Sequence, residues 1–96
     1  MADKELDISW MCKQVAHHYG ITSQMYILAE ECAELAKEAL KYNRPKDNIK
    51  ELVEEIADVE IMLEQTKMLL GDVLDDIKKI KTEKLLRQIE RIKRGL

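Results

Sequence analysis

The positions of the helix-breaking residues constrain this chain more than any other feature of its sequence. Its 96 residues include only three glycines and one proline, and Gly20, Pro45 and Gly71 divide it into segments of helical length. Because glycine commonly ends helices and proline interrupts them, this division predicts four helices. They are expected over residues 7–19, 23–42, 47–70 and from 72 onward. Short connections favour antiparallel neighbours, so we expect a single domain over residues 1–96, an all-α antiparallel four-helix bundle.

Composition excludes several classes of protein. Hydrophobic residues make up 46% and charged residues 36%, which is too apolar for a disordered chain, and no apolar run is long enough to span a bilayer. The net charge of −3 and the 4% of aromatic residues argue against a nucleic-acid partner. The chain opens without a secretory leader, and Cys12 and Cys32 form no CxxC pair, so we expect a cytoplasmic protein.

The charges are distributed unevenly along the chain. Residues 30–64 carry eleven acidic against five basic side chains, a balance of −6. Residues 78–96 carry eight basic against two acidic side chains, a balance of +6. This asymmetry fits either helices that attract one another or a cation site beside an anion site.

The second and third predicted helices share a repeated pattern at an offset of 24 residues. Residues 30–35 read EECAEL and residues 54–59 read EEIADV. At about 100° per residue, each copy has an apolar stripe with acidic side chains along one edge. The stripes consist of Leu28, Cys32 and Leu35 on one helix and Leu52, Ile56 and Val59 on the other.

Antiparallel pairing would bring the acids of the two copies together. Two pairs of acids are placed symmetrically about the predicted turn, because the midpoint of the two residue numbers is 44.5 for both: Glu34 with Glu55, and Glu31 with Asp58. Each pair should therefore lie at one level of the hairpin. Four carboxylates so close raise one another's pKa unless a cation is bound, and oxygen-only ligands favour Mg²⁺ or Mn²⁺. A bundle di-iron site would need Glu-x-x-His motifs, but the only histidines are His17 and His18.

These acids resemble the EExxE…ExxD signature of the MazG-like all-α nucleotide pyrophosphohydrolases, of the small single-domain type. The similarity extends to Gln24 before YILAEECAEL, to Arg44 in the turn, and to the segments EEIADVEIML and EKLLRQIERI, so that it covers residues 18–94. It implies Mg²⁺-dependent hydrolysis of a nucleoside triphosphate to a monophosphate and pyrophosphate, with nucleotide-pool sanitising as the role that such an activity suggests.

The resemblance also implies roles for individual residues. The metal ligands, with Mn²⁺ as a substitute ion, would be Glu31, Glu34, Glu55 and Asp58. Glu34 would orient or deprotonate the attacking water, and Glu30 would have a supporting role. Lys84 and Arg87 match positions that meet the phosphates, and Gln24, two helical turns before Glu31, could reach the base or sugar.

Alternatives within and outside the family stay open. Phosphoribosyl-ATP pyrophosphohydrolases typically place Tyr-His where this chain has Ile61-Met62, so that role is less favoured, and the dimeric dUTPases are longer. A different reading is a non-catalytic helical interaction or nucleotide-binding module, in which the acids and bases only pair. Because 96 residues enclose little core, we expect a homodimer or a homotetramer in either case.

Overall fold

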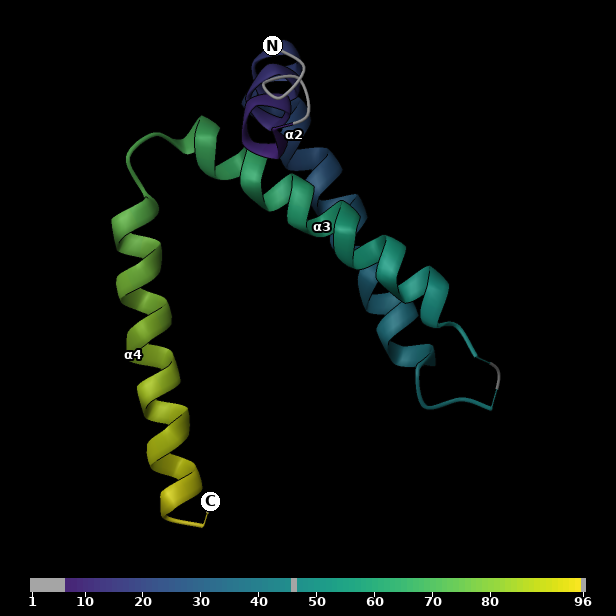
Figure 1. The fold of residues 1–96 in the computed structure, drawn as a ribbon, viewed down its shortest axis with the longest axis vertical. Coiled ribbons are helices and arrows are strands. Elements are labelled where there is room, and N and C mark those ends of the chain that lie inside the picture. The colour runs from purple at the N-terminus through teal and green to yellow at the C-terminus, as the bar shows by residue number, and fades with distance from the viewer. Residues whose placement is uncertain (1–6, 46, 96) are drawn as a thin grey trace.

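The computed structural model describes residues 7–45 and 47–95 and is all-α across them. Three helices follow one another, α2 (Ile8–Lys41), α3 (Ile49–Leu70) and α4 (Leu74–Lys93), and the described ranges contain no strand. Figure 1 shows α2 and α3 side by side and α4 directed away from them. The predicted all-α class is confirmed.

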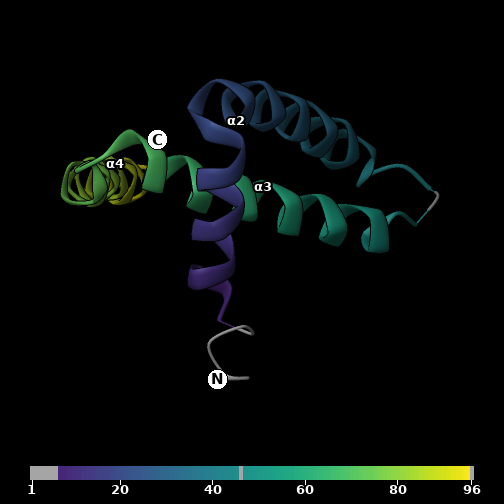
Figure 2. The same cartoon turned by 90° about the horizontal axis from the view of Figure 1, so that it is seen from above.

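Helix α2 is a single element that bends sharply at Gly20. Asp7 caps its start, because the Asp7 carboxylate accepts a hydrogen bond from the Ser9 backbone N–H at 2.9 Å. Gly20 has φ 83° and ψ 170°, a conformation that favours glycine and that breaks the helical path. The predicted break at Gly20 is therefore confirmed, although no separate loop follows it. Figure 2 shows residues 8–19, hereafter the arm, leaving the line of the rest of α2.

Residues 21–41 of α2 and the whole of α3 form the predicted antiparallel hairpin. Asp47, the first residue of the predicted third helix, lies one residue before the observed N-cap, Asn48. The Asp47 carboxylate accepts a hydrogen bond from the Ile49 N–H at 3.0 Å. Helix α3 thus starts two residues after its predicted start.

Asn48 also fastens the turn to the end of α2. Its amide nitrogen Nδ2 donates to the Glu38 carbonyl oxygen at 2.9 Å and to Glu38 Oε1 at 3.1 Å. Lys41 Nζ lies 3.4 Å from Glu38 Oε2. The hydrogen bond from Asn48 is the main reason why the pKa of the buried Glu38 carboxyl is lowered, and Lys41 adds to the effect.

We expect Asn48→Ala to lower the melting temperature by about 5 °C at pH 7. A carboxyl with a lowered folded-state pKa stabilises the protein above its ordinary pKa, near 4.5, and this contribution is lost as the pH falls through the lowered value. The difference between wild type and variant should therefore shrink in acid. Thermal melts from pH 7 to pH 3 measure it, and a constant difference would contradict the role of Glu38.

The apolar core is small. The buried apolar side chains of the described residues are Cys12, Ala16, Val59 and Met62. Leu28, Leu35 and Leu52 of the predicted stripes are half-buried, whereas Cys32 and Ile56 are exposed, so the prediction was wrong for these two residues. For Ile56 the physical reason is that the arm lies on another side of α3, where Cys12 lines a pocket with Ala57 and Ile61.

The four-helix bundle is the main correction to the predicted fold. The described chain has three helices, and α4 has no buried residue and does not pack extensively on α2 or α3. The linker of residues 71–73 directs α4 outward, since Gly71 has φ 92° and the Val73 N–H bonds back to the Gly71 carbonyl at 3.0 Å. Both views show α4 diverging from the hairpin (Figures 1 and 2). Among the described helices, none combines the length and apolar character needed to cross a membrane.

Candidate metal site

Three of the four predicted metal ligands come together on the hairpin. One carboxylate oxygen each from Glu31, Glu55 and Asp58 lies within 4.8 Å of the other two. Glu31 comes from α2, while Glu55 and Asp58 are three residues apart on one side of α3. The antiparallel pairing that the shared midpoint predicted therefore brings the acids of the two helices together.

Burial and mutual repulsion act on two carboxyls of this triad, Glu31 and Glu55. Partial burial raises the pKa of Glu31 most, and the charges of Asp58 and Glu55 raise it further. Burial is also the main cause of the raised pKa of Glu55, followed by the charges of Asp58 and Glu34. Like charges disfavour one another's ionised forms, so the triad carries an uncompensated negative potential at neutral pH.

One oxygen of the triad lacks the partner that a buried polar atom needs. Glu55 Oε2 is enclosed by the protein, yet no donor in the described part of the chain hydrogen-bonds to it. A buried carboxylate oxygen without a donor is costly unless a cation or water satisfies it. This atom is the strongest structural indication that the triad is a place for a cation.

Glu34 lies at the edge of the triad. It is exposed on α2, three residues after Glu31, and its charge raises the pKa of both Glu31 and Glu55. Its oxygens do not join the group of three that lie within 4.8 Å of one another. The structure therefore places Glu34 beside a cation site but does not include it among the clustered ligand atoms.

The residues predicted to bind substrate do not converge on the triad. Lys84 and Arg87 are exposed on α4, which diverges from the hairpin. Gln24 is 1% exposed and is the largest fully buried side chain, so it is enclosed in the hairpin and does not face solvent. Its Oε1 atom has no hydrogen-bond partner in the described structure.

The sequence analysis missed a second group of buried polar side chains at the level of Gln24. Gln65 and Thr66 are 3% and 6% exposed, and the Thr66 hydroxyl is also without a described partner. Burial raises the pKa of the Cys12 thiol, and a hydrogen bond with Gln65 opposes that effect. The residue numbers of Gln24 and Gln65 have the same midpoint, 44.5, as those of the acidic pairs. The same calculation would therefore have predicted that these two side chains lie at one level of the hairpin.

The donor set of the triad suits a hard divalent cation. Carboxylate oxygens alone are the preferred ligands of Mg²⁺ and Mn²⁺, whereas zinc and copper sites usually include nitrogen or sulfur. His17 and His18 are exposed on the arm and do not belong to the cluster. Glu31, Glu55 and Asp58 would hold the ion, and its charge would satisfy the orphaned Glu55 oxygen.

Comparison with known proteins adds no identification. No protein-family description, curated protein or solved structure matches this chain. The class that the fold and site define is an all-α protein with a helical hairpin that carries a carboxylate triad.

Proposed function

We propose that this chain is a Mg²⁺-dependent nucleoside triphosphate pyrophosphohydrolase, with Mn²⁺ as a possible substitute ion. The observation that carries the proposal is the carboxylate triad with its buried, unpartnered Glu55 oxygen. The EExxE…ExxD resemblance supports the same reaction, the hydrolysis of a triphosphate between its α- and β-phosphates. Water is consumed, and the products are a nucleoside monophosphate and pyrophosphate.

The acidic residues of the hairpin would have different roles in this reaction. A bound Mg²⁺ supplies positive charge for the phosphate oxygens and makes a nearby water more acidic. Glu31, Glu55 and Asp58 would hold that charge between the two helices of the hairpin. Glu34, exposed beside them, is free to accept the proton of the attacking water, because its carboxylate is not among the clustered ligand atoms.

Lys84 and Arg87 are the proposed phosphate contacts, and their position on the diverging α4 affects how they can act. Within this chain they do not approach the triad, so the proposal requires either movement of α4 or a second copy of the chain. A homodimer or homotetramer would supply α4 from another copy. Gln24, which is buried, would act by fixing the hairpin or would reach a ligand only after a local rearrangement.

Pyrophosphate release tests the proposal directly. We expect release from at least one member of a panel of standard and modified NTPs and dNTPs with Mg²⁺ or Mn²⁺, and none with EDTA. Glu55→Gln should lower the rate at least about 100-fold, because loss of a metal ligand should cost no less than loss of its supporting partners. Glu54→Gln, which removes the same charge from the neighbouring exposed residue, is the matched control and should retain most of the activity.

A helical interaction module is the second candidate, favoured by the many exposed apolar side chains on α3 and α4. Such a module would release no pyrophosphate from any member of the panel and would not respond to Mg²⁺. Absence of release together with absence of metal-induced stabilisation would overturn the enzymatic proposal. A metal-stabilised protein without release would be a nucleotide-binding module that does not cleave.

A further inference from the structure

Helix α3 carries an apolar seam that nothing in the described structure covers. The seam positions follow one another at alternating steps of four and three residues, the spacing by which helices pack along their length. Glu60 and Lys67 occupy two of the positions. The others are large apolar residues, all of them exposed: Ile49, Val53, Ile56, Leu63 and Leu70.

Helix α4 carries a matching stripe of similar length. It is 20 residues long against 22 for α3, and it has no buried residue. At about 100° per residue, five of its seven large apolar side chains gather on one side of the helix, where Lys78 and Lys81 also lie, whereas Ile80 and Leu86 lie on other sides. This stripe consists of Leu74, Ile77, Leu85, Ile89 and Ile92. An isolated amphipathic helix of this length draws most of its stability from packing, so the stripe needs a surface to cover it.

The chain as a whole exposes more surface than a closed monomer of its mass. Its accessible surface is 8039 Å², whereas compact monomers of 11.2 kDa expose about 5,700 Å². Its radius of gyration is 16.8 Å, against about 12.5 Å for a compact domain of this length. The excess of about 2,300 Å² is well above the ~800 Å² that each partner of a standard interface buries. The single chain therefore leaves enough surface uncovered for an interface of standard size.

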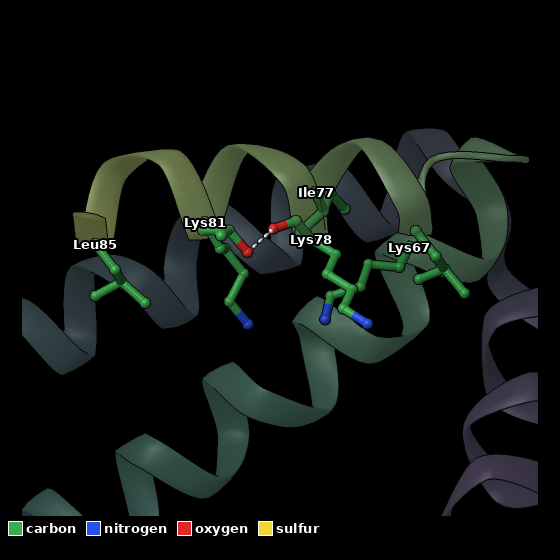
Figure 3. A pocket seen from close by; sticks show the side chains of 7 residues that line it. Lys67, Ile77, Lys78, Lys81 and Leu85 are labelled. Atoms are coloured by element: carbon green, nitrogen blue, oxygen red, sulfur yellow. Dashed lines mark hydrogen bonds between the residues drawn. The ribbon is translucent and has the colours of Figure 1, made fainter. Parts of the chain in front are cut away.

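Three lysines lie where α3 and α4 of one chain meet, so charge opposes closure of α4 at the linker end of its own α3. Figure 3 shows the side chains of Lys67, Lys78 and Lys81 reaching into the groove between the end of α3 and the start of α4. No acidic side chain of the described residues forms an ion pair with these three lysines. Because the linker has only three residues, antiparallel closure would set Lys67 level with Ile77 and next to Lys78. Lys67 and Lys78 would then repel each other at the linker end of the seam, although Glu60 would lie level with Lys84 further along.

A second copy is not bound by that linker. The α4 helix of a second copy can shift along α3 by about half a turn relative to closure within one chain. Asp75 and Asp76 then lie beside Lys67. Further along, Lys78 and Lys81 lie near Glu64 and Glu60. The helices are also complementary overall. α3 has six acidic and two basic residues, a balance of −4, and α4 has seven basic and four acidic residues, a balance of +3.

We propose that α4 of one copy lies antiparallel along the α3 seam of a second copy, and that the second copy's α4 does the same in return. Such an isologous pair covers both seams and both stripes by one two-fold axis. The helical bundle that one chain does not complete would thereby form between two chains. The proposal specifies the surfaces of the homo-oligomer and rests on the two helices alone, not on the proposed catalysis.

Sedimentation velocity of the full chain, with and without substitutions, tests the proposal. Wild type should sediment with twice the 11.2 kDa mass of the chain at micromolar concentration. Leu63→Glu in the seam and Leu85→Glu in the stripe should each give a monomer that is still helical by circular dichroism. Leu40→Glu, an equally apolar and 77% exposed position on α2, is the matched control and should stay dimeric.

Disulfide trapping identifies which chain supplies α4. In a Cys32→Ser background, a Val53→Cys copy mixed with an Ile89→Cys copy should give a disulfide-linked pair of chains under mild oxidation, in higher yield than either copy alone, because the proposed register sets these two positions level. A monomeric wild type, or a dimer unaffected by both Glu substitutions, would overturn the proposal. So would a disulfide that forms only within single chains carrying both cysteines, because it would show α4 closing on its own α3. None of these readouts depends on pyrophosphate release, so failure of the assembly and failure of the enzymatic proposal are distinguishable.

Discussion

Addition of Mg²⁺ is expected to raise the melting temperature of this protein by roughly 10–20 °C when the free ion is at 100 times its Kd. Binding to the folded state alone contributes about 2.7 kcal/mol at that concentration, and each kcal/mol shifts the melting temperature of a domain of this size by about 4–8 °C. The shift arises because the ion relieves the repulsion among Glu31, Glu55 and Asp58 and satisfies the buried Glu55 oxygen. Differential scanning calorimetry across a Mg²⁺ titration measures it.

Two controls separate specific binding from general screening of an acidic protein. NaCl at matched ionic strength should shift the melting temperature far less, because screening acts on all exposed charges and not on one site. Glu55→Gln should remove most of the Mg²⁺ shift, whereas Glu54→Gln should keep it. A shift of equal size in both variants, or in NaCl, would show that the triad does not hold the ion.

The pairing of the acids could be predicted because it depends only on local rules. Once two helices are joined by a short turn, a fixed rise per residue sets which positions share a level. The Arg44-Pro45 turn thus fixed Glu31 opposite Asp58, and the structure places these carboxylates in one cluster. The buried Gln24 and Gln65 obey the same rule, and a search of the shared midpoint for polar pairs would have found them.

The position of α4 could not be predicted from the same rules. Periodicity shows that a helix has an apolar side but does not show which surface will cover it. Gly71 and Val73 determine the direction of α4 through backbone conformation, and a sequence pattern does not specify that conformation. Lys84 and Arg87 were expected near the phosphates because they match positions of the family that the sequence resembles, and in this chain α4 carries them away from the acids.

The exposed Cys32 and Ile56 show a related limit of the sequence pattern. Both residues lie on stripes that a two-helix pairing would bury, but α3 has more apolar surface than one neighbour can cover. Ala57 and Ile61 line a pocket with Cys12 of the arm, Val59 is buried, and Ile56 lies on the uncovered seam. An apolar stripe predicts which residues are candidates for burial. The bend at Gly20 sets where the arm lies, and so affects which of these residues are buried in the structure.

Without metal, the triad should weaken the fold, so Glu55→Gln is expected to raise the melting temperature of the metal-free protein at pH 7. The pKa of Glu55 and that of Glu31 are raised above their ordinary value near 4.5. A carboxyl raised in this way favours the folded state below its ordinary pKa, and that contribution is lost as the pH rises through the raised value. At neutral pH the ionised acids repel, and a neutral amide at position 55 removes part of that repulsion.

The raised pKa values of Glu31 and Glu55 also predict how the stability of the protein depends on pH. Metal-free wild type should become more stable as the pH is lowered from 7 toward 5, whereas Glu55→Gln should gain less over that range. The Glu38 carboxyl, whose pKa is lowered, loses its stabilising contribution only below about pH 4.5. This loss therefore does not mask the gain in stability expected between pH 7 and pH 5. Mg²⁺ should reverse the trend, because protons compete with the ion for the same oxygens. Melts in EDTA and in Mg²⁺ at pH 5, 6 and 7 test both signs, and a metal-free stability that falls with acid over this range would refute the repulsion on which the cation site depends.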